Sequence, residues 1–343
     1  MIWGEVRKLL CVRLDSIGDV LMTTPAIRAC KESFDCHITL LTSGAGSAAA
    51  RLVPEIDATL RFAAPWMKPP ALRGDEAMIE CLAAGRFDAA VIFTVYSQSP
   101  LPAAYMCYLA GIPLRLAHCH ENPYQLLTDW VPDPEPASGI RHEVQRQLDL
   151  VASVGARAGN ERLSFVVPET ARAVVKALLA GQTERLVVVH PGASAASRRY
   201  PPEQFARAAD LVIEETGCHA VFTGDVHEQE LIRSVQARMS HPSLSLVGRL
   251  NLAELGALIE AADLLICNNT GPAHIAAALG TPVVNLYALT NPQHTPWQVQ
   301  SRVLYHDVPC RNCYKSVCPA GHHDCLKRVA PESVAAAARE LLP

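Results

Sequence analysis

The stretch that decides the fold is LLCVRLDSIGDV, residues 9–20, in which an apolar run leads directly into a short polar turn. Residues 9–14 are predicted to form a buried strand, and residues 20–32 then have the composition of a helix. Further strands are predicted at residues 37–41 and 89–93. Continuous apolar strands separated by helices are typical of a parallel sheet covered on both faces.

The pattern begins again in the second half of the chain. Strands are predicted at residues 186–189, 220–222, near Leu246, 264–267 and 282–286, with helices at residues 202–216, 226–239, 252–262 and 272–279. This alternation predicts an α/β fold with a doubly wound unit of five or more strands.

A chain of 343 residues is too long for one ordinary core and suits two domains. We expect the boundary near residues 168–182, with one Rossmann-like domain at 1–170 and a second at 171–343. The alanine-rich tail after Pro331 predicts a closing C-terminal helix.

The composition excludes several classes of protein. Half of the residues are hydrophobic, which excludes intrinsic disorder. Lys and Arg total 30 against 34 Asp and Glu, so a general nucleic-acid binder is not expected, although a few arginines would still hold one anionic ligand. No apolar run reaches the roughly 18 residues of a membrane span. The charged N-terminus lacks a signal-peptide core, which predicts a cytoplasmic protein.

The polar turn after the first strand contains Gly18 and Asp19. A glycine at the carboxyl end of a parallel strand allows another molecule to approach the backbone closely. Asp19 is expected in the first turn of the helix, where it either complements the helix dipole or acts as a catalytic base. The turn has no GxGxxG, so a dinucleotide site, and with it an oxidoreductase, is not favoured.

Three strand-end loops of the second half suit an anionic ligand. In the loop after residue 190, Gly192 and Ser194 precede Arg198, and small residues with arginines are typical of phosphate binding. In the second loop, Gly224 and Glu228 would approach a nucleotide base or ribose. For both loops an ordinary turn with solvated side chains is the alternative.

The third loop, residues 267–274, is the most specific of the three. Asn269 or Thr270 would cap a helix whose first turn holds Pro272. The free N–H groups at Gly271 would point at an anion, with His274 facing the same mouth, so we favour a diphosphate site. The polar loop 290–297 follows the last predicted strand and would line the same crevice.

Four cysteines form a C-x2-C-x4-C-x6-C array at residues 310–325: Cys310, Cys313, Cys318 and Cys325. In a reducing compartment this spacing favours a structural zinc or iron site, and a compact thiol-rich loop without metal is the alternative. We expect no catalytic role for this segment, because no strand-end mouth is predicted to adjoin it.

Together these residues resemble glycosyltransferase family 9, the bacterial ADP-heptose–lipopolysaccharide heptosyltransferases. The motifs that carry the resemblance occur in the family's order and span nearly the whole chain: residues 13–21 with 23–26, 190–193, 269–274 and 290–292. The family often has a lysine where Arg198 stands here, and many members have Asp where this chain has Asn269.

The resemblance implies a GT-B architecture, in which two Rossmann-like domains face each other across a cleft. It implies an ADP-sugar donor in the C-terminal half, a glycolipid or glycan acceptor in the N-terminal half, and inverting transfer without a catalytic metal. Asp19 matches the family's proposed base. By analogy, the protein would touch the inner face of the inner membrane at most peripherally.

Three functions remain open at this point. The first is transfer of a heptose to a lipopolysaccharide core or related glycan. The second is a family 9 enzyme with another NDP-sugar or a secondary-metabolite acceptor, and the third is a non-catalytic nucleotide-binding protein. For the acceptor, Gly18 and Arg61 are the candidate contacts, with a solvated surface arginine as the alternative for Arg61.

Overall fold

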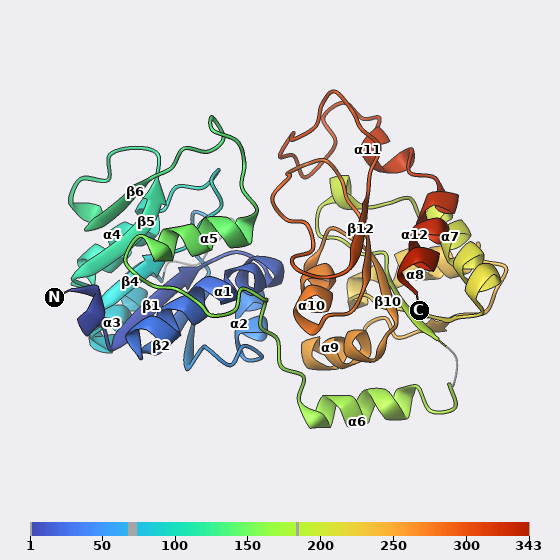
Figure 1. Ribbon diagram of the computed structural model, residues 1–343, viewed down its shortest axis with the longest axis horizontal. Coiled ribbons are helices and arrows are strands. Elements are labelled where there is room, and N and C mark those ends of the chain that lie inside the picture. Colours follow the sequence, from blue (N-terminus) through green and yellow to red (C-terminus); the bar gives the residue numbers. More distant parts are fainter. Residues whose placement is uncertain (1, 68–73, 183–184, 343) are drawn as a thin grey trace. The chain divides into compact units, whose positions relative to one another are not determined.

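A computed structural model describes residues 2–67, 74–182 and 185–342 (Figure 1). The chain divides into two compact units, Met1–Val166 and Val167–Pro343. Each unit is built around its own parallel sheet. Among the described residues, no helix is both long enough and apolar enough to cross a bilayer.

The first unit contains a six-stranded sheet in the order β3-β2-β1-β4-β5-β6. Its strands are β1 (Lys8–Arg13), β2 (His37–Thr42), β3 (Ala58–Arg61), β4 (Ala89–Ile92), β5 (Leu114–Cys119) and β6 (Asp129–Pro132). Its helices are α1 (Ile17–Phe34), α2 (Gly44–Ala50), α3 (Asp75–Gly85), α4 (Leu101–Leu109) and α5 (Glu143–Ala152), with short 3-10 turns at Trp3–Glu5 and Tyr124–Leu126.

The second unit also contains six strands, in the order β12-β11-β10-β7-β8-β9. They are β7 (Leu186–His190), β8 (His219–Phe222), β9 (Leu244–Ser245), β10 (Leu264–Asn268), β11 (Val283–Leu286) and β12 (Ser301–Leu304). The helices are α6 (Glu169–Leu178), α7 (Pro202–Thr216), α8 (Gln229–Gln236), α9 (Leu252–Ala261), α10 (Gly271–Leu279), α11 (Asp324–Lys327) and α12 (Pro331–Leu341), with 3-10 turns η3 (Ala196–Arg198) and η4 (Val226–Glu228).

Both sheets have the same topology. In each unit the first strand lies in the middle, the second and third follow on one side, and the fourth to sixth follow on the other. This is the Rossmann strand order, and the direction of winding reverses between β1 and β4 and between β7 and β10. The expectation of two Rossmann-like doubly wound units, as in the GT-B fold class, is confirmed. Doubly wound sheets bind ligands at the carboxyl ends of the strands beside this switch point.

The cores follow from the strand sequences. Leu10, Val12 and Ile92 of the first sheet pack in one apolar cluster with Leu82 of α3 and Ala104 of α4. In the second unit, the closing helix α12 joins the core through buried residues that include Val334 and Ala338, so the predicted C-terminal helix is confirmed.

Some predicted elements differ from the structure. The predicted helix 226–239 is confirmed only in part. α8 covers Gln229–Gln236, and the Asp225 side chain, which accepts from the His227 N–H, caps the separate 3-10 turn η4 before it. The strand predicted near Leu246 lies at Leu244–Ser245. Helix α1 begins at Ile17, three residues earlier than predicted.

Candidate functional site

The switch point of the first unit holds a buried arginine among three acids. Arg13 ends β1 with its side chain fully buried. Its Nε lies 3.0 Å from Asp15 Oδ2, its Nη2 3.1 Å from Asp19 Oδ1, and its Nη1 2.8 Å from Oε1 of Glu143 in α5. Burial alone would lower the pKa of Arg13, but the Glu143, Asp15 and Asp19 carboxylates together raise it above its ordinary value.

Asp19 lies in the first turn of α1, as predicted. Its Oδ2 accepts from the Ser16 backbone N–H at 3.1 Å and from the Ser16 hydroxyl at 2.6 Å, while Oδ1 faces Arg13. These bonds brace the start of α1. The side chain is 15% exposed, so the carboxylate is reached by solvent at the end of the sheet.

Asp15 shares the arginine with Asp19 and is a site residue that the sequence reasoning missed. Burial, with further repulsion from the Asp19 and Glu143 carboxylates, raises the pKa of Asp15 to about 6 despite the charge of Arg13. Gln98 Nε2 donates to Asp15 Oδ1 at 2.8 Å. The sequence feature that could have indicated this cluster is Arg13, a charged residue at the end of an apolar strand. Nothing in the sequence links it to Glu143, which is 130 positions away.

The two predicted acceptor contacts lie outside this cluster. Gly18 is buried inside the first turn of α1. Arg61 ends the edge strand β3 and is exposed, with its guanidinium close to Gly44 at the start of α2. It lines a shallow cavity with Arg51 and Asp57.

The switch point of the second unit begins with a neutral histidine. His190 ends β7, and burial lowers its pKa to about 4. Its Nδ1 lies 3.0 Å from the Thr223 hydroxyl after β8, and its Nε2 lies 3.9 Å from Glu228 Oε2. The ring therefore joins two strand-end loops without adding charge.

Glu228 is held against the two predicted loop glycines. A Cβ atom at Gly192 would overlap the Glu228 carboxylate, and a Cβ at Gly224 would lie 2.9 Å from its Oε2. The Asp225 N–H donates to the same oxygen at 2.9 Å. Burial raises the pKa of Glu228. The structure thus brings together Gly192, Gly224 and Glu228, and a larger residue at either glycine would displace the Glu228 carboxylate.

The loop after β10 leads into the N-terminus of α10. Buried Asn268 ties this loop to the β7 loop, since its Nδ2 donates to the Pro191 carbonyl at 2.7 Å. Pro272 occupies the first turn of α10, as predicted. The expectation of a side-chain cap is wrong, because Thr270 stands at the N-cap but its hydroxyl makes no capping bond. The amide end of α10 is therefore available to an anion.

The remaining predicted donor residues surround this end of the sheet. Asn269 and His274 are buried, Thr270 and Gly271 are half-buried, and Ser194 is exposed. Burial raises the pKa of Tyr287, while the His294 N–H, the Arg198 charge and the Asn269 side chain oppose that rise. Arg198 and Asn269 therefore both lie near the Tyr287 hydroxyl, which donates to the Asn291 carbonyl at 2.7 Å.

The cysteine-rich segment packs on these loops, so the expectation that no strand-end mouth adjoins it is wrong. The Ser197 N–H donates to the Ser316 carbonyl at 3.0 Å, and the Ser197 hydroxyl donates to the Lys315 carbonyl at 2.7 Å. The Tyr314 N–H donates to the Thr290 carbonyl at 2.8 Å. The segment makes these bonds because its irregular backbone needs partners outside itself.

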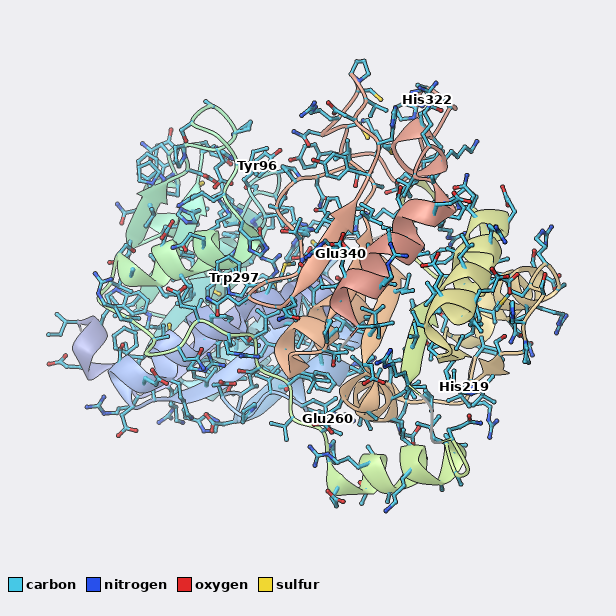
Figure 2. The ribbon with its side chains drawn as sticks, turned by 45° about the vertical axis from the view of Figure 1, so that its right-hand side comes forward. Tyr96, His219, Glu260, Trp297, His322 and Glu340 are labelled. Carbon is cyan, nitrogen blue, oxygen red and sulfur yellow. The ribbon has the colours of Figure 1, made fainter. Side chains whose placement is uncertain are left out.

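The four cysteines influence one another without forming a ligand cage. Burial raises the pKa of Cys325, and the thiols of Cys318, Cys310 and Cys313 add to the rise. Cys310 Sγ lies 3.7 Å from Nε2 of His322, whose side chain is labelled in Figure 2. Across residues 2–67, 74–182 and 185–342, no three His, Cys, Asp or Glu side chains are arranged to hold a metal ion. The thiols and the imidazole are donors that suit a soft metal.

Comparisons of the sequence with a family model and with known proteins point to the same family. A model of glycosyltransferase family 9 (heptosyltransferase) matches residues 77–323. Lipopolysaccharide heptosyltransferase 3 of Escherichia coli K12 is 25% identical over 351 residues, which cover 95% of each chain. Lipooligosaccharide heptosyltransferase 2 of Campylobacter jejuni is 30% identical over 165 residues, 46% of this chain and 51% of that protein. The chain thus spans about half the length of this relative.

A solved heptosyltransferase structure shares the fold. The solved structure of Escherichia coli ADP-heptose lipopolysaccharide heptosyltransferase II superimposes with a TM-score of 0.77 at 21% identity, covering 97% of this chain and 98% of that chain. At this identity the match speaks for the fold, while the family model covers more than half of the sequence. The chain therefore belongs to glycosyltransferase family 9, the heptosyltransferase family.

Proposed function

We propose that the protein is an inverting glycosyltransferase that moves a heptose from ADP-heptose to a lipopolysaccharide core or a related glycan. The observation that carries this proposal is the loop set at the ends of β7 and β10. There, glycine backbone, a neutral histidine and an uncapped helix N-terminus meet beside Arg198. Such a site suits a nucleoside diphosphate.

Glu228 would bind the ribose or base of the donor. Its carboxylate is fixed by the Asp225 N–H and by the close approach of Gly192, so it presents a rigid acceptor to a sugar hydroxyl. The diphosphate would then reach Ser194 and the N–H groups at Thr270 and Gly271. Buried Asn269 and His274 would shape the wall behind it.

Charge builds on the departing ADP as its bond to the sugar breaks. The amide end of α10 and the Arg198 guanidinium would stabilise that charge. In the proposed mechanism these two groups supply the positive potential that stabilises the departing ADP, and a catalytic metal does not.

Asp19 would act as the base. An inverting transfer needs one carboxylate to accept the proton of the acceptor hydroxyl as that oxygen attacks the anomeric carbon. Arg13 and Ser16 orient the Asp19 carboxylate with three hydrogen bonds, so little reorganisation is needed when the hydroxyl arrives.

The acceptor in this proposal is a glycolipid or glycan, and Arg61 is kept as a candidate contact. A glycolipid acceptor is anchored in a membrane by its lipid. We therefore expect a cytoplasmic protein with peripheral contact at the inner face of the inner membrane. A family 9 enzyme with another NDP-sugar or a secondary-metabolite acceptor, or a non-catalytic nucleotide-binding protein, is the alternative.

A donor screen tests the proposal. The purified full chain is incubated with ADP-heptose and with a panel of other ADP-, GDP- and UDP-sugars in the presence of lipopolysaccharide core acceptor, and free nucleotide and glycosylated product are measured by mass spectrometry. We expect ADP and a heptosylated product from ADP-heptose. Turnover with a different nucleotide sugar would favour the second alternative, and nucleotide binding without any product would favour the third.

A further inference from the structure

The first unit contains a cavity that the proposed chemistry leaves unused. It has a volume of about 310 Å³ and lies at the carboxyl ends of β1 and β4, where Leu14 and Asp15 follow one strand and Phe93 and Thr94 follow the other. This is the switch point at which doubly wound sheets bind ligands. The volume is at the low end of the range of about 300–1,000 Å³ typical of small-molecule sites. It therefore suits one small ring, which can be a single residue of a longer ligand.

The lining of the cavity combines an apolar surface with a few polar groups. Most of the lining is apolar and includes the Trp66 indole, which is 37% exposed. Phe62 packs against Trp66 in an edge-to-face pair with ring centroids 5.7 Å apart and limits its movement. A fixed, partly exposed aromatic ring offers a flat apolar surface to the C–H face of a sugar.

Three polar side chains of the lining can bind hydroxyl groups. Asp15 uses two of its roughly four lone-pair sites on Arg13 and Gln98, so further sites are left for a ligand. The Gln98 amide adds a carbonyl acceptor beside them. The Thr94 hydroxyl is buried and has no hydrogen-bond partner in the part of the chain that the structure describes. A ligand hydroxyl would satisfy it.

The charge of the site selects between classes of sugar. The Arg13 guanidinium is enclosed by its carboxylates, and the charged side chain that lines the cavity is Asp15. A carboxylate there repels an anionic sugar acid and accepts hydrogen bonds from a neutral, hydroxyl-rich ring.

We propose that this cavity is the subsite for a neutral pyranose ring of the acceptor, with Trp66 as the apolar platform and Asp15 and Gln98 as its hydrogen-bond partners. The proposal rests on the proposed transferase function and extends it. Arg13 pairs with both Asp15 and Asp19, so one arginine joins the subsite to the proposed base. Asp15 is a binding residue in this account, and Asp19 alone accepts the proton.

Fluorine NMR of the full chain tests the subsite without any turnover. The chain has four tryptophans, and labelling with 5-fluorotryptophan gives one signal each for Trp3, Trp66, Trp130 and Trp297, assigned by single Trp→Phe variants. The probes are methyl α-D-mannopyranoside, which is neutral, and glucuronic acid, which is anionic. We expect the neutral pyranoside, added up to about 100 mM and so far above a millimolar Kd, to shift the Trp66 signal saturably. Glucuronic acid should shift it much less.

Two variants and one matched control sharpen this result. Gln98→Leu and Asp15→Asn should each weaken pyranoside binding about tenfold, the effect of one lost hydrogen bond to a charged or polar partner. Trp130 is the matched control, because it belongs to the same unit, is 40% exposed and lies on β6 away from the lining, so its signal should stay in place. Thermal unfolding checks that each variant is folded. One folded variant is enough to test whether the substituted side chain binds the pyranoside.

Three results would overturn the subsite: no selective shift of Trp66 at the highest pyranoside concentration, equal binding of glucuronic acid, or unchanged binding by the folded variants. A failed subsite and a failed transferase function remain distinguishable, because product formation in the donor screen does not depend on this signal. If the donor screen yields heptosylated product and Trp66 stays unmoved, the function stands and the acceptor binds elsewhere.

Discussion

The two switch points share one topology and differ in chemistry. In both units the first and fourth strands lie side by side and end at loops that start a helix. After β1 the loop carries Asp15 and Asp19 around one enclosed arginine. After β7 and β10 the loops carry glycines, amides and a neutral histidine.

This difference shows how one fold provides two unlike sites. The strand order fixes where a ligand binds, and the loop residues decide which ligand fits. Three carboxylates against one guanidinium favour a neutral, hydroxyl-bearing ligand in the first unit. The backbone N–H groups and Arg198 favour an anionic ligand in the second.

The largest expected effect comes from removing the acid of the first switch point. Asp19→Asn keeps the size of the side chain but cannot accept a proton, so kcat should fall by about 10²–10⁴-fold while the Kd for ADP changes less than about twofold. Steady-state product formation and calorimetric titration of ADP measure the two quantities. Glu76→Gln, which neutralises an exposed acid in the first turn of α3, is the control and should leave both unchanged. Full turnover by Asp19→Asn would show that Asp19 is not the base.

A second prediction concerns pH and compares one buried histidine from each unit. Burial lowers the pKa of His190 in the second unit, and of His118 in the first, from 6.5 to about 4. Because the folded pKa is the lower one, the unfolded chain takes up the proton first, and stability is lost as the pH falls from about 6.5 towards 4. For His190 this loss is about 2 kcal/mol between about pH 7 and pH 5.

Urea unfolding of wild type, His190→Gln and His118→Gln at both pH values checks this prediction. Each variant should lose about 2 kcal/mol less than wild type on acidification, since glutamine does not titrate there. ADP should stabilise the second unit, which contains His190, against unfolding. It should not stabilise the first unit, which contains His118. Equal acid sensitivity of wild type and His190→Gln would contradict the burial of a neutral His190.

Arg198→Ala should weaken ADP binding about tenfold, because one charge-assisted hydrogen bond to a phosphate is lost. Arg198→Lys keeps the charge without the planar fork and should lose less. The control is Arg207→Ala, which removes an exposed arginine from α7 of the same unit. Calorimetry with ADP gives the values, and unchanged affinity in Arg198→Ala would remove Arg198 from the diphosphate site.

The smallest expected effect concerns the cysteine segment. If Cys310, Cys313, Cys318 and Cys325 hold a structural zinc or iron, elemental analysis of anaerobically purified protein should find about one metal ion per chain, and Cys313→Ser should lose it. Because the segment supports the loops at Ser197 and Thr290, that loss should weaken ADP binding by about threefold.

Cys81→Ser, which changes an exposed cysteine of the first unit, should keep both the metal and the affinity for ADP. Wild-type protein without metal would refute the structural site.

The sequence predicted the parts of the fold whose signals are local. Helix α7 was predicted at its observed bounds, because Pro202 starts it and Gly217, in a left-handed conformation, ends it. Strands β3, β6 and β12 were missed because they are short and only half-buried. Strand β5 was missed because Arg115 and His118 interrupt its apolar residues, although both are buried.

In the candidate sites too, residues in local motifs could be predicted, and contacts between distant parts of the sequence could not. Motif residues such as Asp19 and Gly271 were predicted from strand-end position and resemblance. The contact of Gly192 with Glu228, the pairing of Arg13 with Glu143 and the support of Ser197 by Lys315 join residues far apart in the sequence. Such contacts depend on the three-dimensional packing of loops, for which a single sequence carries no local signal.

The most direct test of the contrast between the two switch points is a crystal structure of the full chain with ADP. We expect the diphosphate at the carboxyl ends of β7 and β10, within hydrogen-bond distance of the Gly271 N–H and near Arg198. A diphosphate bound instead at the carboxyl ends of β1 and β4, beside Asp15, would contradict it.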